Sequence, residues 1–344
     1  MTQTILAALC RRLAADVDGI ELSLEEVDLP DPGPGEVQVR LMACAANFPD
    51  VLMLQGKYQL RPPLPFSPGD EGAGVVERLG EGIDDLKEGD RVVVALRYGG
   101  FREALNVPRA GVNPMPATMS FAQAASYQTA YMTAYVGLVV RGGIQAGEWL
   151  MVHGATGGVG MAAVDLGKHF GARVIATGGT DEKLAVVKAR GADHVINYTM
   201  EDGRLGGFRQ RVKEITGTGG ADLIFDPVGG DVFDESMRCV NFGGRILAIG
   251  FTSGRWPQAP VNLVLIKELS IIGVRAGEIG RRHPEIGRAN RKALRELAES
   301  GVLHPHVSHA LPLERALDVL QLLVHRQVIG KAVVTMNGYE WDRE

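Results

Sequence analysis

The 344-residue chain has few cysteines, no excess of basic charge and no long apolar run at its start. Cys10, Cys44 and Cys239 lie far apart and form no CxxC pair, which excludes a disulfide framework and favours a reducing compartment. The net charge is −5, from 36 basic and 41 acidic residues, so the charge balance gives no reason to expect a nucleic-acid partner. A positive region is missing ahead of the short first apolar run, and we therefore expect a cytoplasmic protein without a secretory signal.

Residues 110–140 also lack charge, but they contain prolines and many Ser, Thr, Gln and Tyr residues. A membrane span needs about 20 predominantly apolar residues, so this composition predicts a buried helix pair and no membrane association.

Glycine, in contrast, is abundant, and the most informative run, VHGATGGVG, covers residues 152–160. An apolar strand precedes it, and a helix and a second strand follow. Glycines let the backbone approach a pyrophosphate, and the helix N-terminus offers free N–H groups to the anion. The run therefore predicts a dinucleotide site with contacts from Gly157, Gly158, Val159 and Gly160. Ala155 replaces the first glycine of the usual pattern, and a glycine turn without a ligand is the alternative.

The order of the predicted elements indicates an α/β fold. Residues 1–126 are β-rich, with strands expected over 36–42, 74–80 and 90–96. Strands at 149–153, 172–177, 193–196, 221–226, 244–249 and 269–274 then alternate with helices at 158–170, 181–190, 207–216 and 230–240. Six strands with helical crossovers predict a doubly wound parallel sheet of the Rossmann type. Amphipathic helices at 285–300 and 313–325 and a strand at 331–336 complete the chain.

Six short motifs in this order resemble those of the medium-chain dehydrogenase/reductase superfamily, and within it those of the zinc-independent quinone oxidoreductases, the zeta-crystallin group. They are AANFPD (45–50), PGDEGAG (68–74), TAY (133–135), GATGGVG (154–160), ADHVINY (192–198) and GKAV (330–333). The resemblance implies a GroES-like catalytic domain built from both chain ends. Its first part would be residues 1–126, followed by an NADP-binding Rossmann domain over 127–266. Residues 267–344 would supply the last Rossmann strand and the return to the catalytic domain.

Zinc-dependent relatives place a Cys near position 47, a His-Glu pair near 70–71 and a four-Cys lobe near 100. Here these places hold Asn47, Asp70-Glu71 and the sequence RYGGF. Because catalytic zinc needs three N, S or O ligands, we expect no metal site. The histidines at 304, 306 and 309 are expected to be exposed loop residues.

The end of the second Rossmann strand bears on the choice of nicotinamide cofactor. Folds that bind NAD usually carry an acid there, but this strand ends in Thr177, Gly178, Gly179 and Thr180. Small residues leave room for a 2′-phosphate and favour NADPH, although Asp181 and Glu182 follow as first-turn acids behind an expected N-cap at Thr180. The resemblance implies that Lys183 and Tyr198 contact the phosphate. A solvated lysine and a strand-end tyrosine are the alternatives.

Loops at the carboxyl ends of the later strands are expected to hold the nicotinamide end of the cofactor. The candidate residues are Val228, Gly250, Phe251, Ser253, Val274 and Arg275. Thr133 resembles a helix hydroxyl that faces the cofactor in this family, with simple packing as the alternative.

Without zinc no Lewis acid polarises an alcohol, so the acceptor must be electrophilic by itself: a quinone, or a C=C conjugated to a carbonyl. Asn47 and Tyr58 are the candidate donors to the developing oxyanion, and Asp50 is a third candidate catalytic residue. Asn47 and Asp50 can equally hold a turn through local hydrogen bonds. No side chain is a compelling general acid, which leaves water as the proton source. Leu52 replaces a Tyr of some family members and weakens a strict quinone preference.

Two other functions stay open. One is the reduction of enoyl thioesters or 2-alkenals, and the other is a non-catalytic NADPH-binding protein that acts through partner or RNA binding. We also expect a homodimer joined through the apolar strand at 269–274, because such an edge is normally covered or paired.

Overall fold

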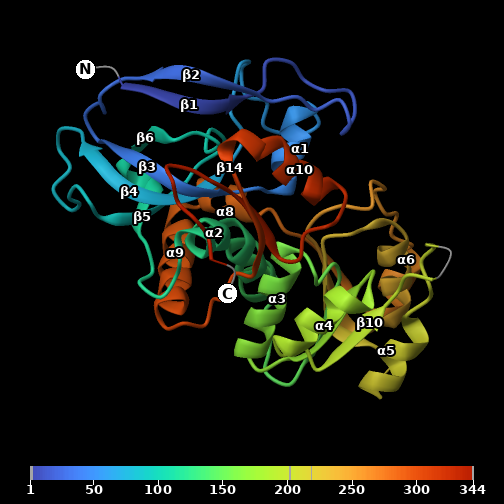
Figure 1. Cartoon of the computed structure of the whole chain (residues 1–344). Helices are drawn as coiled ribbons and strands as arrows, with labels where there is room; N and C mark the ends of the chain where they lie inside the picture. Colours follow the sequence, from blue (N-terminus) through green and yellow to red (C-terminus); the bar gives the residue numbers. More distant parts are fainter. Residues whose placement is uncertain (1–2, 201–202, 218, 343–344) are drawn as a thin grey trace. The chain divides into compact units, whose positions relative to one another are not determined.

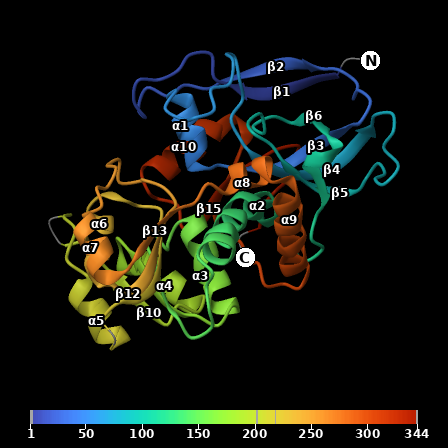
Figure 2. The same ribbon diagram turned by 180° about the vertical axis from the view of Figure 1, so that it is seen from behind.

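The computed structural model describes residues 3–200, 203–217 and 219–342 (Figures 1 and 2). The chain divides into two compact units. Unit 1 comprises Met1–Thr129 and Pro305–Glu344, and unit 2 comprises Ala130–His304.

Both ends of the chain enter one mixed sheet in unit 1. Its strand order is β14-β15-β3-β4-β5-β7, and β6 also pairs with β3. The strands are β3 (Glu36–Ala45), β4 (Glu71–Leu79), β5 (Arg91–Ala95), β6 (Ala104–Pro108), β7 (Val112–Pro114), β14 (Val307–Pro312) and β15 (Lys331–Thr335). The C-terminal β15 runs antiparallel to β3, with Val334 opposite Cys44. The family's expected use of both chain ends in one domain is therefore visible in the strand pairing.

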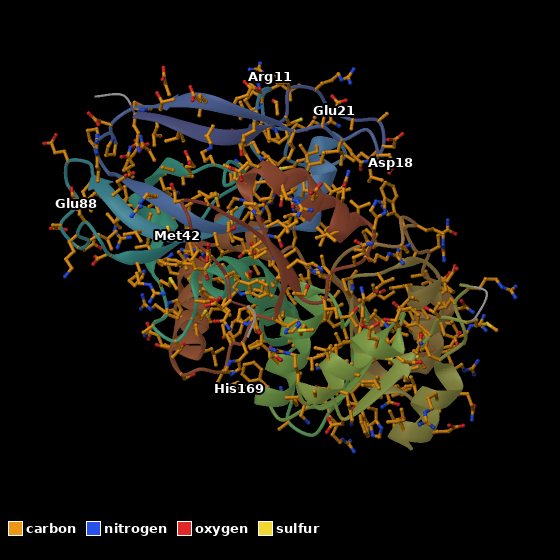
Figure 3. The ribbon with its side chains drawn as sticks, viewed as in Figure 1. Arg11, Asp18, Glu21, Met42, Glu88 and His169 are labelled. Carbon is orange, nitrogen blue, oxygen red and sulfur yellow. The ribbon has the colours of Figure 1, made fainter. Side chains whose placement is uncertain are left out.

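The remaining elements of unit 1 complete its core. A two-stranded sheet joins β1 (Gln3–Leu9) to β2 (Ser23–Leu29), and helix α1 (Phe48–Leu54) contacts α10 (Ala316–Val324). Val39 and Leu41 of β3 pack with Leu320 of α10 in one apolar cluster. Charged side chains such as Arg11, Glu21 and Glu88 lie on the exposed outer surface of this unit (Figure 3).

Unit 2 contains the predicted doubly wound sheet, with six parallel strands in the order β10-β9-β8-β11-β12-β13. They are β8 (Trp149–Val152), β9 (Arg173–Gly178), β10 (His194–Asn197), β11 (Ala221–Asp226), β12 (Val240–Ala248) and β13 (Ser270–Gly273). The strand order reverses between β8 and β11, and open α/β sheets bind ligands at the carboxyl ends of the strands beside such a reversal.

Helices of unit 2 include α3 (Gly158–His169), α4 (Asp181–Ala189), α5 (Arg209–Thr216), α6 (Gly230–Cys239), α7 (Val261–Lys267), α8 (Ala276–Arg282) and α9 (Pro284–Glu299). The four predicted helices, α3 to α6, are present between these strands, α7 lies between β12 and β13, and α8 and α9 follow β13. Leu150, Ile175 and Phe225 of the central strands are fully buried, because strands covered on both faces are apolar throughout. All six predicted strands are present, although β12 begins four residues earlier than expected.

The expectation of a helix pair within residues 110–140 is wrong. Residues 112–114 form β7, and α2 (Phe121–Tyr135) runs on into a π-helical turn, Val136–Arg141. Pro114 and Pro116 lie ahead of the helix and do not interrupt it. Within the described residues, no helix is long and apolar enough to cross a membrane.

Candidate active site

The glycine turn between β8 and α3 leads directly into the N-terminus of α3. Gly157 is the N-cap of α3, with φ −91° and ψ 167°. A Cβ on Gly160 would lie 2.3 Å from the carbonyl oxygen of Gly154, so helix and turn touch through backbone alone. Gly154 has φ +54°, a left-handed conformation that favours glycine, and the Ala155 that follows it is buried. The glycine displaced by one position is therefore the residue that shapes this turn.

The end of β9 carries the residues predicted to select the cofactor. Thr180 is the N-cap of α4, with φ −145° and ψ 141°, and Asp181 and Glu182 occupy the first turn as expected. Partial burial lowers the pKa of Lys183. The ring of Tyr198, beyond β10, lies 6.3 Å from that of Phe208.

Thr177 differs from its neighbours because its side-chain hydroxyl and its backbone carbonyl both form polar contacts inside the unit. Its hydroxyl lies 2.8 Å from Nδ1 of His153, and its carbonyl oxygen accepts the N–H of Ala155 at 3.0 Å. The side chain is fully buried. These contacts argue against direct binding of a cofactor by the Thr177 side chain and assign it to the support of the turn.

The loops after β11 and β12 are joined by hydrogen bonds. Asp226 ends β11, and its Oδ1 accepts the N–H groups of Val228 at 2.8 Å and Gly229 at 2.9 Å. The N–H of Ser253 donates to the carbonyl of Val228 at 3.0 Å. Burial raises the pKa of Asp226 to about 6, against the opposing effect of these two backbone donors.

Other predicted nicotinamide residues border the same end of the sheet. Gly250 donates to the carbonyl of Asp226 at 3.4 Å, and Val274 donates to that of Ala248 at 3.0 Å. Phe251 is exposed, Arg275 is the N-cap of α8, and Thr133 lies half-buried on α2. All predicted cofactor residues thus lie in unit 2, where their binding role stays a prediction.

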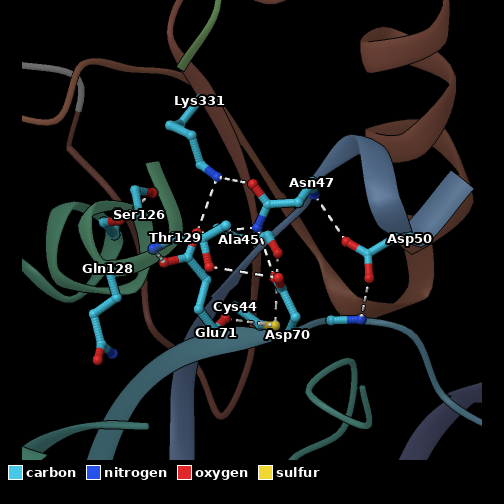
Figure 4. A network of polar contacts seen from close by, with 12 residues as sticks. Cys44, Ala45, Asn47, Asp50, Asp70, Glu71, Ser126, Gln128, Thr129 and Lys331 are labelled. Atoms are coloured by element: carbon cyan, nitrogen blue, oxygen red, sulfur yellow. Dashed lines mark hydrogen bonds and ion pairs between the residues drawn. The ribbon is translucent and has the colours of Figure 1, made fainter. Parts of the chain in front are cut away.

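Unit 1 contains a buried polar network around Asn47, drawn in Figure 4. Asp50, on the first turn of α1, accepts the N–H of Asn47 and the N–H of Gly69, each at 2.8 Å. These bonds join α1 to the loop before β4. They favour the turn-holding interpretation of Asp50.

The amide of Asn47 is fully engaged in this network. Its Nδ2 donates to Oδ1 of Asp70 at 2.7 Å and to Oε1 of Glu71 at 3.0 Å, and its Oδ1 accepts from Nζ of Lys331. An amide nitrogen has two hydrogens, so both are directed at carboxyl groups. Asn47 would have to release one of them to bind an oxyanion. Tyr58, half-buried in the loop after α1, packs against the apolar core of the unit.

Lys331 is the functional candidate that the sequence analysis does not assign. Its Nζ lies 3.0 Å from Oε1 of Glu71, and the two side chains are 5% and 1% exposed. Oε2 of Glu71 accepts the N–H of Thr129 at 2.9 Å. A lysine inside a predicted apolar strand was an available signal, because lysine is almost never buried without a partner.

The donor set around Asn47 does not fit zinc. No group of three or more His, Cys, Asp or Glu in the described residues could hold a metal ion. The Lys331 ammonium group already binds the Glu71 carboxylate, which a metal ion would need as a ligand. Cys44 donates its thiol to the carbonyl of Glu71 at 3.0 Å, and burial raises the pKa of this thiol well above its usual value. Of the histidines at 304, 306 and 309, His304 is exposed. His306 and His309 are half-buried, and His309 lies on β14, so the expected exposed loop is wrong for these two.

Two family models match the chain. An alcohol dehydrogenase GroES-like domain matches residues 33–117, and a zinc-binding dehydrogenase domain matches residues 158–294. The quinone oxidoreductase-like protein 2 homolog of Nematostella vectensis is 36% identical over 305 residues, covering 88% of this chain and 82% of the relative. Human quinone oxidoreductase is 30% identical over 313 residues, covering 90% and 92%.

Solved structures agree with these matches. A probable oxidoreductase from Mycobacterium abscessus has a TM-score of 0.85 and 34% identity, covering 97% of this chain and 99% of that one. A mycobacterial protein solved in complex with NADPH has a TM-score of 0.85 and 28% identity, covering 96% and 99%. The JamJ enoyl reductase has a TM-score of 0.80 and 26% identity, covering 97% and 100%.

The GroES-like unit, the Rossmann-type sheet with its glycine turn and these relatives together define an oxidoreductase with an NAD(P)-binding fold. The chain belongs to the medium-chain dehydrogenase/reductase superfamily and is similar to its quinone oxidoreductase-like members.

Proposed function

We propose that the protein is an NADPH-dependent reductase that transfers a hydride to a quinone or another conjugated carbonyl acceptor without zinc. The observation that carries this proposal is the Lys331 ammonium bonded to Glu71 and Asn47, at positions where zinc-dependent relatives place metal ligands. A positive side chain there disfavours a second cation and leaves no Lewis acid to activate an alcohol. When bound, NADPH would supply the hydride.

The cofactor would be held by unit 2. The first turn of α3, at Gly158, Val159 and Gly160, would receive the pyrophosphate. Lys183 and Tyr198 would contact the 2′-phosphate, since β9 ends in Gly178 without an acidic residue. The solved relative that holds NADPH supports this choice over NADH.

The acceptor would be polarised by hydrogen bonds from unit 1. Tyr58 is the favoured donor, since both amide hydrogens of Asn47 are directed at Asp70 and Glu71. Asp50 would act through the shape of the α1 loop.

Enoyl thioester or 2-alkenal reduction is the second candidate, and the similarity to the JamJ enoyl reductase favours it. Both candidates require hydride addition to a conjugated system. Oxidation of NADPH, followed by absorbance against a panel of quinones, enones, 2-alkenals and enoyl-CoA esters, distinguishes them. Turnover of simple alcohols with NADP⁺, abolished by chelators, would contradict the proposal.

We also propose a homodimer and a location in the reducing cytoplasm. β13 is the edge strand of its sheet, and Ile271 on it is exposed. The nearby α7 exposes Val261, Leu265 and Ile266, so pairing here would cover an apolar surface. The three cysteines are all buried free thiols, which suits a reducing compartment. Cell fractionation tests the location.

A further inference from the structure

The network around Asn47 contains more carboxyl groups than cations. Asp50, Asp70 and Glu71 lie together, and Lys331 is the basic side chain bonded to them (Figure 4). Placing several carboxylates in one enclosed site is unfavourable, so one of them is expected to hold a proton. The pattern of hydrogen-bond donors shows which one.

Two of the three carboxyl groups receive donors that suit an ionised carboxylate. Asp50 accepts two backbone N–H groups, and its side chain is fully buried. Glu71 accepts from Lys331 and Asn47 on one oxygen and from the N–H of Thr129 on the other. Every one of these donors stabilises the charged form.

Asp70 receives much less support as an anion. Its Oδ1 accepts from Asn47 at 2.7 Å, while its Oδ2 lies 3.4 Å from the hydroxyl of Thr129, which can accept as well as donate. Asp70 is also partly exposed, whereas Asp50 and Glu71 are buried. It is therefore the carboxyl group that can both hold a proton and exchange it with its surroundings.

We propose that Asp70 is the general acid that protonates the α-carbon of the reduced acceptor. This assignment rests on the proposed function. Hydride addition to the β-carbon moves the C=C electron pair toward the carbonyl oxygen and forms an enolate. The enolate pair then takes the proton of Asp70 as the α-C–H bond forms. The carbonyl is restored, and the Asp70 carboxylate takes up a proton from solvent.

The groups around Asp70 set its pKa. Burial, then the charges of Asp50 and Glu71, raise the pKa of Asp70 to about 8, against the opposing effects of Lys331 and Asn47. The groups that face it come from α1 (Asp50), β4 (Glu71), β15 (Lys331), β3 (Cys44) and α2 (Thr129). Asp70 is thus protonated at neutral pH, and its capacity as an acid is expected to fall above pH 8. Asn47, held by Lys331, is a positioning residue, because it binds Oδ1 and leaves Oδ2 to carry the proton.

The test compares Asp70→Asn with wild type on two acceptors. An α-substituted cyclic enone needs protonation at carbon, whereas the hydroquinone anion formed from 1,4-benzoquinone is protonated at oxygen by water. We expect enone reduction to fall by about 10²-fold, as for other general acids, and to fall far more than quinone reduction. In D₂O, wild type should add deuterium to one face of the α-carbon, and Asp70→Asn to both. Asp318→Asn, on α10 and paired with Arg315 at the surface, is the matched control.

A measurement on the cofactor-free protein shows whether Asp70 holds a proton, independently of enzyme activity. Infrared difference spectra taken on raising the pH through about 8 should lose a carboxylic-acid carbonyl band in wild type and in Asp318→Asn, but not in Asp70→Asn. Equal losses on both acceptors, or unchanged facial selectivity, would overturn the acid role. Reduction of quinone but of no enone by wild type would overturn it and leave the proposed function standing. If neither acceptor were reduced, the proposed function would fail, and the infrared band would still decide whether Asp70 holds the proton.

Discussion

The candidate polar sites of the two units are made of different chemical groups. In unit 2 the candidate cofactor site is mainly backbone: the Gly154–Gly160 turn and the loops after β11 and β12. In unit 1 the network is made of side chains from α1, β4 and β15, and Asn47 and Lys331 are 284 positions apart. A backbone site tolerates side-chain changes but no added Cβ, whereas a side-chain network fails when one charge is removed.

The largest expected effect follows from removing the buried cation. Lys331→Met leaves Glu71 buried without its ion-pair partner, and breaking such a pair costs about 3–5 kcal/mol in the free energy of unfolding. Urea denaturation measures this cost. The double variant Lys331→Met/Glu71→Gln removes both charges and should recover a large part of the loss. A single variant as stable as wild type would contradict the ion pair's structural role.

Gly160→Ala tests the backbone site in the same way. The new Cβ would lie 2.3 Å from the carbonyl oxygen of Gly154, and overpacking of this kind costs about 1–3 kcal/mol. Because the turn must move, NADPH binding should fall as well, which fluorescence titration measures. Gly157→Ala is the matched control for the stability loss, since its nearest neighbour would be 3.5 Å away and its φ of −91° suits alanine. Equal effects of the two variants would argue against a tight turn.

This difference also explains what could be predicted from the sequence. The strands of unit 2 are recognisable in the sequence as short apolar runs, and the glycine turn follows one of them. The fold of this unit and its candidate cofactor loops can therefore be predicted from local sequence patterns. The contacts of Lys331 and Asp70 depend on pairing β15 with β3 and β3 with β4, which no local pattern specifies. α7 was missed because Val261, Leu265 and Ile266 are exposed, and its core contacts come from Leu263 and Val264, which are only partly buried.

His153 makes the stability of unit 2 sensitive to acid. Its Nδ1 and Nε2 lie 2.8 Å from the hydroxyls of Thr177 and Ser236, and burial lowers its pKa to about 3. Since the unfolded chain binds this proton near pH 6.5, the native state should lose about 1.4 kcal/mol per pH unit as the pH falls from there toward 3. Denaturation curves at several pH values measure the slope. His153→Gln should flatten it, whereas the exposed His325→Gln should not.

Lys183 tests a proposed cofactor contact in unit 2 that depends on a side-chain charge. Lys183→Ala should weaken NADPH binding at least tenfold, about 1.4 kcal/mol, and leave NADH binding nearly unchanged, because only NADPH carries the 2′-phosphate. Wild type should itself prefer NADPH by at least tenfold. Titration of both cofactors against Lys188→Ala, a lysine later on α4, provides the control. Equal affinities of wild type for the two cofactors would refute the preference.

Ile271→Lys is expected to change the stability of the folded chain least of all these substitutions. It should nevertheless abolish the proposed dimer. Ile271 lies on the edge strand β13 and is already exposed, so the substitution should change the free energy of unfolding of one chain by less than about 0.5 kcal/mol. In a two-fold pairing of β13 edges, however, two new ammonium groups would face each other across the symmetry axis. Light scattering at micromolar concentration should therefore give a dimer for wild type and a monomer for the variant. Phe242→Lys, at an exposed position on β12, introduces the same charge outside β13 and should remain dimeric. A monomeric wild type would end the dimer proposal, and a dimeric Ile271→Lys would move the interface elsewhere.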